Sequence, residues 1–515
     1  MPMNLLHSFT INNQRLMADK GKRSGNPEPA GTTGTSGVDK IVVRMYRPGT
    51  GDFFLLLFKT GEKVTYKMLI DCGCINAGKD TFTPYLEDLK KTTGGKIDVL
   101  VVTHEHADHI NGFKIASDYF RDNIKFKKVW FAWTESKDDP VAGKYRKTNM
   151  AVKNAIAGVA NKMNGLVKDQ YYEKQFRGSS NEKLMTNAQH HFIASLTELH
   201  ELNTLSAAGN NNTMEDFLKE NNVIDKSTEV NFYHPGETIS GEPGAKGIRF
   251  YILGPPKDPV YLGKEEKTDD TYQKREKPGS IDFAFINAFA AEGDLESPVL
   301  PFKSTYELTD TRDPLIRKYK EHNWRSIDND WMYAAGSIAL RFEKSINNTS
   351  LVFAIQFEES ERILLFPGDA EYGNWASWHD GLTWDINKGG KKKKVNARYI
   401  LKNVVFYKVG HHLSQNGTAK SMGFELMLNP NMAAMASLDY KKISKVWLNT
   451  MPNDELGASL LKRTKGKFFF AGDTSVILDN IKTDRVSVFP KDEKECRKMN
   501  GAFSDSPFID YEVTG

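Results

Sequence analysis

The chain has 515 residues, which is enough to bury a large core and is compatible with roughly two to four domains or with one elaborated α/β unit. Its 70 Lys and Arg residues nearly balance its 66 Asp and Glu residues, so the charge neither requires nor excludes nucleic acid as a partner. Three cysteines are too few for a disulfide framework, which fits a reducing compartment. We find no signal-peptide pattern and no apolar run of about 18 residues, so we expect a cytoplasmic protein with no membrane span.

The first part of the chain alternates strand and helix signals. Residues 1–38 end in a stretch rich in Gly, Pro, Ser and Thr, and we expect a flexible N-terminal segment there. Three strand signals, IVVRMY, DFFLLLFKT and VTYKMLIDCG, follow with short turns between them, and antiparallel strands are the simplest interpretation. A helix is predicted over residues 81–91 and a buried strand over residues 127–133. This order is typical of an α/β fold.

The most informative stretch is IDVLVVTHEHADHING at residues 97–112. Its apolar start predicts a buried strand, and in an extended chain His104 and His106 point to the same side. If a helix follows, Asp108 and His109 rise from its first turn. Two imidazoles would then face one ion, while the carboxylate and the third imidazole face a neighbouring ion. Zinc prefers such nitrogen and oxygen ligands. A polar loop is the weaker alternative, because three His fall within six residues of a chain that has twelve.

Two aspartates at strand ends are further candidates. Asp71 ends the third strand signal, where it can cap a turn and also accept a hydrogen bond that orients a metal ligand. Asp369 follows Gly368, and only Pro367 separates this pair from the apolar segment ILLF at residues 363–366. A carboxylate at the end of a central strand can bridge two cations. Asp473 lies in a second Gly-Asp pair without a nearby His, so we expect it to be a turn residue.

Strands are also predicted over residues 337–342 and 349–357 and, nearer the C-terminus, in KVWLNT. Another strand signal, VVFYK, leads into the adjacent residues His411 and His412. The segment SQN follows closely, and its side chains can hydrogen-bond a substrate. Residues 389–394, GGKKKK, precede this strand; we expect a solvated loop, with phosphate binding as the alternative.

Residues 137–226 have a helical character and are predicted to form an insertion that shapes a substrate pocket or docks a protein partner. His190, His191 and His200 lie in or beside its apolar stripe, and we expect surface or packing roles for them rather than metal ligation. His234 precedes a Pro-Gly pair and is expected to be a strand-end residue, with metal ligation as the alternative.

The order of these candidates along the chain resembles the ligand order of the metallo-β-lactamase superfamily: Asp71, the HEHADH segment, Asp369, and then the pair of His residues. Three segments resemble more narrowly the metallo-β-lactamase-like domain of DNA-uptake competence proteins and the choline-phosphate esterases. They are GTGD at residues 49–52, NNTSLV at 347–352 and HHLS at 411–414. The segments IDNDWMYAAGSIALRF and FPGDAEYGNWASW also resemble a group of large stand-alone bacterial members.

The resemblance implies an α/β fold of the αββα sandwich type, interrupted by the helical insertion. Its two halves would span residues 39–136 and 227–440, and residues 441–515 would form a C-terminal α/β extension packed on the same domain. Two departures stand out. Asn347 or Asn348 occupies the slot where hydrolases of the superfamily usually have a third His for the first metal, and Leu413 replaces a Gly beside the His pair.

These features predict a metal-dependent hydrolase that acts on phosphodiester bonds, with nucleic acid as one candidate substrate, through a metal-activated water. Two Zn²⁺ ions are expected, with Mn²⁺ as the alternative. The expected ligands are His104, His106, Asp108, His109, Asp369 and one of His411 and His412. The other His of that pair would contact the substrate, Asp108 would also serve catalysis, and Asp71 would orient a ligand. Two alternatives remain open: a binding or regulatory module with a degenerate site, and an ester or lactone hydrolase.

Overall fold

The computed structural model describes residues 37–168, 213–262, 342–443, 451–481 and 490–515, together with positions 314 and 318. The described residues belong to two compact units. The first takes them from Met1–Ser136, Met214–Lys274 and Asn347–Gly515, and the second from Lys137–Thr213 and Arg275–Ile346. The domain boundaries expected from the sequence stay predictions. In the second unit, helix α4 (Pro140–Lys168) agrees with the helical pattern of residues 151–167.

The first sheet of the first unit combines antiparallel and parallel strands in the order β16-β1-β2-β3-β4-β5-β6. Strands β16 to β3 pair antiparallel, and β3 to β6 pair parallel. The strands are β1 (Lys40–Tyr46), β2 (Phe54–Thr60), β3 (Lys63–Ile70), β4 (Lys96–Val101), β5 (Lys125–Ala132), β6 (Glu229–Tyr233) and β16 (Phe508–Thr514). The predicted antiparallel start of the layer is confirmed.

The second sheet has the same mixture, in the order β15-β14-β13-β10-β9-β8-β7. Strands β7 to β10 pair antiparallel, and β10, β13, β14 and β15 pair parallel. The strands are β7 (Thr238–Ser240), β8 (Ile248–Gly254), β9 (Val352–Phe357), β10 (Ile363–Phe366), β13 (Val404–Lys408), β14 (Ala433–Ala436) and β15 (Phe468–Phe470). The expected α/β class is therefore confirmed, with two mixed sheets.

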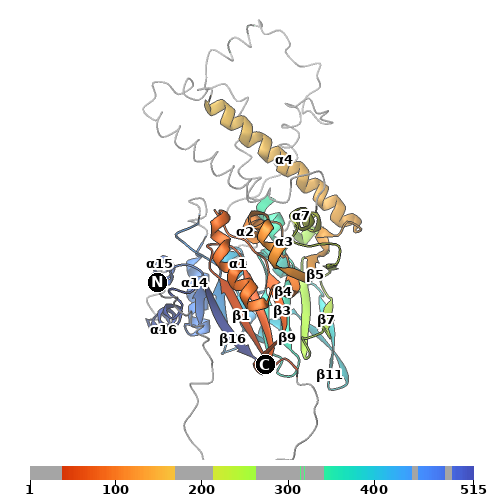
Figure 1. The fold of residues 1–515 in the computed structure, drawn as a ribbon, viewed down its shortest axis with the longest axis vertical. Coiled ribbons are helices and arrows are strands. Elements are labelled where there is room, and N and C mark those ends of the chain that lie inside the picture. Colours follow the sequence, from red (N-terminus) through yellow and green to blue (C-terminus); the bar gives the residue numbers. More distant parts are fainter. Residues whose placement is uncertain are drawn as a thin grey trace, which may run out of the picture. The chain divides into compact units, whose positions relative to one another are not determined.

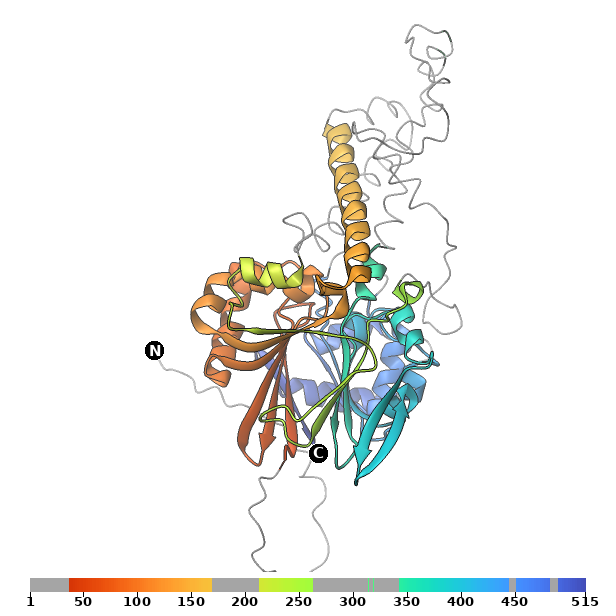
Figure 2. The same cartoon turned by 90° about the vertical axis from the view of Figure 1, so that its right-hand side faces the viewer.

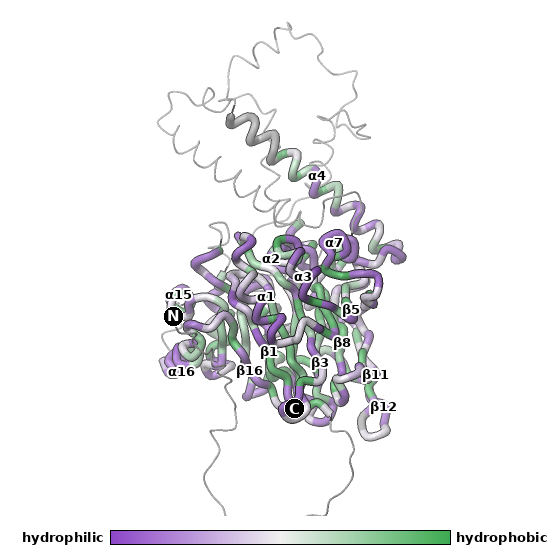
Figure 3. Tube along the Cα trace, viewed as in Figure 1, coloured by the Kyte–Doolittle hydropathy of each residue, from purple (hydrophilic) through white to green (hydrophobic). Residues whose placement is uncertain are grey.

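The two sheets lie face to face, and the core fills the space between them (Figure 2). Aromatic rings from opposite sheets meet there: the Phe54 and Phe366 centroids are 6.4 Å apart, and those of Trp130 and Phe250 are 5.1 Å apart. Figure 3 shows the hydrophobic strands inside the unit and hydrophilic segments around it. Burial of these large apolar side chains is the main source of stability for the pair of sheets.

Helices α1 (Lys79–Thr93), α2 (Ala107–Ile115) and α3 (Ser117–Asn123) cover the outer face of the first sheet (Figures 1 and 2). Against the second sheet, α14 (Asp454–Thr464) contacts β14 and β15, and α16 (Pro490–Gly501) contacts β15. The other α-helices in the described part of this unit are α7 (Met214–Glu220), α8 (Pro259–Leu262), α12 (Tyr372–Ser377), α13 (Ala397–Lys402) and α15 (Thr474–Asn480). Within the described residues, no helix combines the length and apolarity needed to cross a bilayer.

The lysine run does not form the predicted loop. It forms β12 (Lys391–Asn396), which pairs antiparallel with β11 (Thr383–Lys388). The hairpin turn is Gly389-Gly390, with φ of +57° and +77°, which suits the two left-handed positions of a tight hairpin turn. Val395 pairs with Trp384, and both are buried, whereas the four lysines of β12 are exposed. Cross-strand packing at the base of the hairpin thus extends a charged segment that would be a loop on its own.

Two other strand predictions need correction. Phe342, the described end of the strand predicted over residues 337–342, is helical, and its side chain and that of Ile346 are buried at the four-residue spacing of one helix face. The strand predicted from residue 349 begins only at Val352, because a turn bond from the Ser350 amide to the Asn347 carbonyl precedes it. The predicted strand KVWLNT and the stripe with His190, His191 and His200 lie outside the described residues.

We predict that Phe366→Ala will lower the free energy of unfolding of the first unit by roughly 3–5 kcal/mol, because it removes a ring packed against Phe54, Phe353 and Phe406. Urea denaturation followed by tryptophan fluorescence measures the change. Val260→Ala is the control, since Val260 is 68% exposed and its truncation should change the free energy by less than about 0.5 kcal/mol. Equal effects of the two variants would contradict this account of the core.

Candidate metal centre

The candidate site lies where loops leave the carboxyl ends of parallel strands. After β4 the chain passes through His104 and His106 into α2, whose first turn carries Asp108 and His109. From the second sheet, Asp369 follows β10, and the short helix η6 (Gly410–Leu413) follows β13. The carboxyl ends of parallel strands meet at one edge of a sheet, so segments far apart in the sequence converge there.

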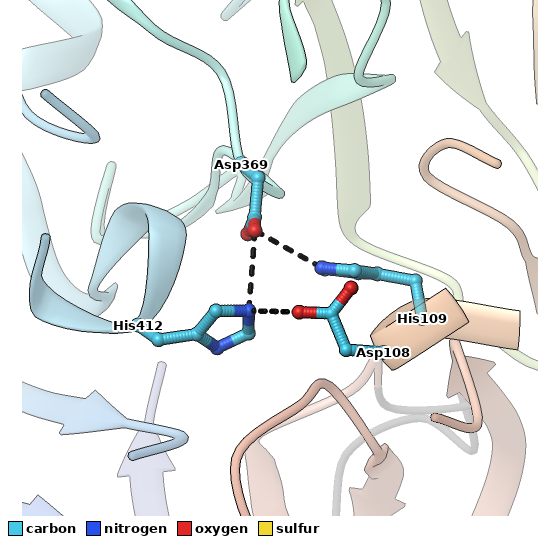
Figure 4. A group of neighbouring side chains, drawn as sticks. All are labelled: Asp108, His109, Asp369 and His412. Carbon is cyan, nitrogen blue, oxygen red and sulfur yellow. Dashed lines mark ion pairs between the residues drawn. The ribbon is translucent and has the colours of Figure 1, made fainter. Parts of the chain in front are cut away.

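Four buried side chains converge on one point (Figure 4). Oδ2 of Asp369 lies 3.1 Å from Nε2 of His109 and 3.1 Å from Nε2 of His412. Oδ2 of Asp108 lies 3.0 Å from the same His412 nitrogen. One ligand atom from each residue lies within 4.8 Å of all the others.

The chemistry of the donor set fits a metal ion. Within the described residues, the buried Nε2 atoms of His109 and His412 have no hydrogen-bond partner, although carboxylate oxygens lie close to both. Atoms that face a common centre without hydrogen-bond alignment are arranged as ligands are. Two imidazole nitrogens and two carboxylate oxygens form a set that zinc accepts in tetrahedral coordination.

A hydrogen bond at Nδ1, the ring nitrogen that faces away from the donor set, orients His109. Nδ1 of His109 lies 2.8 Å from Oδ2 of Asp71, and Asp71 itself accepts bonds from the Thr103 amide (2.8 Å) and hydroxyl (2.6 Å). With its Nδ1 proton donated to Asp71, a neutral His109 presents the lone pair of Nε2 to the site. Asp71 thus contacts His109, and its role in orienting a metal ligand stays a prediction.

The electrostatics of the site reflect an excess of buried carboxylates. Burial lowers the pKa of His109, but Asp369, Asp52 and Asp108 outweigh it and raise that pKa well above its usual value. His104 differs: burial and then its neighbours His109 and His106 lower its pKa well below the usual value. The raised pKa favours a charged His109 when no ion is bound, so a metal ion that binds Nε2 would displace that proton, and the carboxylate excess attracts such a cation.

His104 and His106 lie beside this donor set. Nε2 of His104 is 3.0 Å from Nδ1 of His106, and the His104 and His109 ring centroids are 4.1 Å apart. Among the described residues, no group of three His, Cys, Asp or Glu donors within 4.8 Å of one another includes His104 or His106. The described structure therefore brings Asp108, His109, Asp369 and His412 together around one point, but it does not place His104 and His106 in such a group.

The two adjacent His residues differ in their surroundings. Nδ1 of His412 lies 3.0 Å from the Ser437 hydroxyl, and its Nε2 faces Asp108 and Asp369. Nδ1 of His411 lies 3.1 Å from Oδ1 of Asn416, and its Nε2 remains 4.0 Å from Oδ2 of Asp369. His412 belongs to the four-residue donor set, and His411 stands at its edge.

Asn347 and Asn348 brace the loop after β10. Nδ2 of Asn347 donates to Oε1 of Glu371 (2.8 Å), and Oδ1 of Asn348 accepts from the amides of Glu371 (3.1 Å) and Asn374 (3.2 Å). His234, for which metal ligation is the alternative prediction, lies nearly parallel to the Trp133 ring, with centroids 6.1 Å apart. These contacts fix the segment that carries Asp369.

Cys72 and Cys74 flank a glycine on which the site depends. A Cβ on Gly73 would lie 2.2 Å from the carbonyl of Asp108 and 2.3 Å from the amide of His109. The Cys72 amide donates to the carbonyl of His109 (2.8 Å). Both cysteines are buried and free, and they are small residues packed under the first turn of α2.

Sequence reasoning did not assign a site role to Asp52, Lys408 or Ser437. All three are buried. Nζ of Lys408 lies 2.5 Å from Oδ2 of Asp52 and 3.3 Å from Oδ1 of Asp369. A signal was present: Lys408 is the charged end of the otherwise apolar strand VVFYK, directly before the His pair. Asp473, in contrast, caps α15 by accepting from the Ser475 and Val476 amides, in agreement with its predicted turn role.

Comparison with known families gives no matching family model for this chain, and comparison with curated proteins gives no matching relative.

Leu413 occupies a strained backbone position. Its φ is +68°, in the left-handed region that favours glycine, and His411 and His412 share this region with φ of +44° and +49°. A non-glycine residue there costs roughly 1–2 kcal/mol. The Leu413 side chain is fully buried, and that burial contributes roughly 1.5–3 kcal/mol. The apolar contact therefore outweighs the strain, which explains how this loop accommodates a Leu at a left-handed position.

We predict that Leu413→Gly will destabilise the first unit and that Leu413→Ala will destabilise it more. Both variants lose the buried side chain, but only Gly also relieves the strain, so the Gly variant should be more stable than the Ala variant by about 1 kcal/mol. Denaturant titration of the three proteins measures the order. If the Ala variant were more stable than the Gly variant, as expected for a residue with negative φ, residue 413 would not adopt the left-handed conformation.

Proposed function

We propose that this protein is a metal-dependent hydrolase of the metallo-β-lactamase superfamily, with an αββα sandwich fold, that acts on phosphodiester bonds. The fold supports the proposal, because two mixed sheets face each other and helices cover their outer faces. The observation that carries it is the buried convergence of Asp108, His109, Asp369 and His412 at the ends of strands from both sheets. Zinc is the proposed metal, with manganese as the alternative.

The donor chemistry defines how the residues would serve the reaction. Nε2 of His109 and His412 and Oδ2 of Asp108 and Asp369 would hold the ion. A bound divalent cation supplies a lowered pKa for water and a charge that stabilises the reacting oxygens. Asp71 keeps the Nδ1 proton of His109 in place. These roles require neutral imidazoles and charged carboxylates, so the ion and the carboxylates stabilise each other.

We assign the remaining His of the adjacent pair to the substrate. The Asn416 side-chain oxygen accepts from Ser414 (2.7 Å) and lies 3.1 Å from Nδ1 of His411, which places a proton on that nitrogen. Nε2 of His411 lies 4.0 Å from Oδ2 of Asp369, at the edge of the donor set. From there it can take a proton during attack and return it to the leaving oxygen as a general acid.

The preference for a phosphodiester rests on the resemblance of the segments GTGD, NNTSLV and HHLS to phosphodiester-acting members of the superfamily. Nucleic acid and smaller diesters share that bond. Ester or lactone hydrolysis would use the same donor set. Among the described residues, the donor groups of three or more include neither His104 nor His106, and this favours one competing function, a binding module with a weakened site. Metal content separates that module from an enzyme.

We predict that protein purified without a metal-affinity column will contain zinc or manganese, and that Asp369→Ala will remove it. Asp473→Ala is the matched control, because Asp473 also follows a Gly at a turn but caps α15. Mass spectrometry of the metal content measures both variants. About one equivalent would indicate that only the four-residue set binds tightly, and about two that His104 and His106 hold a second ion. A folded wild-type protein without metal would overturn the enzyme proposal.

We predict a division of labour between the two adjacent His residues. His412→Ala should lose metal, whereas His411→Ala should keep it and lower turnover of bis-p-nitrophenyl phosphate by roughly 10²–10⁴-fold. Metal content and initial rates are measured on the same preparations, with a lactone as the comparison substrate. Loss of metal in the His411 variant would contradict its assignment to the substrate. Activity on the lactone alone would replace the phosphodiester proposal with the lactone one.

A further inference from the structure

A lysine lies buried among the carboxylates of the site. Lys408 ends β13 and is 1% exposed. Its ammonium group contacts Oδ2 of Asp52 (2.5 Å), Oδ1 of Asp369 (3.3 Å) and the carbonyl oxygen of Gly368 (3.0 Å). All three of its N–H donors can therefore be used. A charge buried this deeply persists only when it is paired and hydrogen-bonded.

The partner carboxylate comes from the other sheet. Asp52 precedes β2, and its second oxygen, Oδ1, accepts a bond of 2.5 Å from the Ser437 hydroxyl. The same hydroxyl lies 3.0 Å from Nδ1 of His412. The Asp52 amide also donates to the carbonyl of Asp108 (3.0 Å). Through these contacts, the pair of Lys408 and Asp52 reaches three of the four metal donors.

The direction of the protons follows from this chain. The Ser437 hydroxyl donates to Asp52, so its oxygen is free to accept the Nδ1 proton of His412. Nε2 of His412 then carries the lone pair that a metal needs. The Lys408 ammonium also contacts Oδ1 of Asp369, while Oδ2 of Asp369 faces the imidazoles of His109 and His412.

We propose that Lys408 and Asp52 form a fixed ion pair that positions Asp369 and His412 for the metal. Lys408 restricts Asp369 to one coordinating oxygen, and Asp52 fixes the tautomer of His412 through Ser437. This inference rests on the proposed metal-dependent function, but it concerns residues that do not themselves bind the ion. They are positioning residues, and a purely structural ion pair would affect stability alone.

The test compares zinc affinity and the visible absorption spectrum of the cobalt-substituted protein in wild type and variants. Lys408→Met keeps the length of the side chain and removes its charge. We expect about 10–100-fold weaker zinc binding, the usual effect of losing a group that orients a ligand, and a changed cobalt spectrum. Arg44→Met is the control. It breaks another buried ion pair, with Asp510, whose two residues contact none of the four donors within the described part of the chain.

A double variant separates positioning from stability. Lys408→Met leaves Asp52 as an unpaired buried charge, so it should also lower the melting temperature, as Arg44→Met should. Adding Asp52→Asn removes that charge and should restore much of the melting temperature without restoring zinc affinity. Recovery of both would show that the ion pair acts only through stability and would overturn the inference.

Two outcomes keep the inference distinct from the proposed function. Wild-type protein that binds zinc, together with a Lys408→Met variant of equal affinity and unchanged cobalt spectrum, would overturn the positioning role alone. Wild-type protein with no affinity for zinc or cobalt would overturn the proposed function, and the positioning role with it. Weakened binding in Lys408→Met and in the double variant, with normal binding in Arg44→Met, supports both.

Discussion

The structure of the site depends on how the mutual repulsion of four buried carboxylates is compensated. Asp52, Asp71, Asp108 and Asp369 all lie at the meeting point of the two sheets, each less than 10% exposed. Carboxylates that are removed from water need compensating positive charge or donors. Thr103 and His109 satisfy Asp71, and Lys408 satisfies Asp52 and one oxygen of Asp369. The oxygens that remain face two imidazole nitrogens, the arrangement on which the proposed metal site rests.

The two sheets supply these groups in a complementary way. The first contributes Asp52, Asp71 and the start of α2, and the second contributes Asp369, Lys408 and the adjacent His pair. The site therefore forms only when both sheets pack, so the apolar core between them supports chemistry as well as stability. The ion pair of Lys408 with Asp52 joins the two contributions directly. Because this ion pair joins the two sheets, it links the packing of the sheets to the geometry of the donors.

Sequence patterns predicted much of this arrangement. The HEHADH segment after an apolar strand placed His104 and His106 before a helix and Asp108 and His109 on its first turn, as the structure has them. Asp71 and Asp369 were found because each ends a strand. The sequence patterns gave the wrong secondary structure where contacts with another segment decide it. The lysine run became a strand through its partner β11, and Phe342 became helical because its burial repeats at Ile346.

What the sequence determined by itself is local: which residues have metal-binding chemistry, and which strand or helix end carries them. That His104 and His106 share one side of an extended segment follows from backbone geometry alone. The tertiary structure decided which donors meet. Only the packing of two sheets brings Asp52 to Lys408, across 356 residues of chain, and separates His412 in the donor set from His411 at its edge. Contacts between distant segments depend on the whole fold, and no local pattern encodes them.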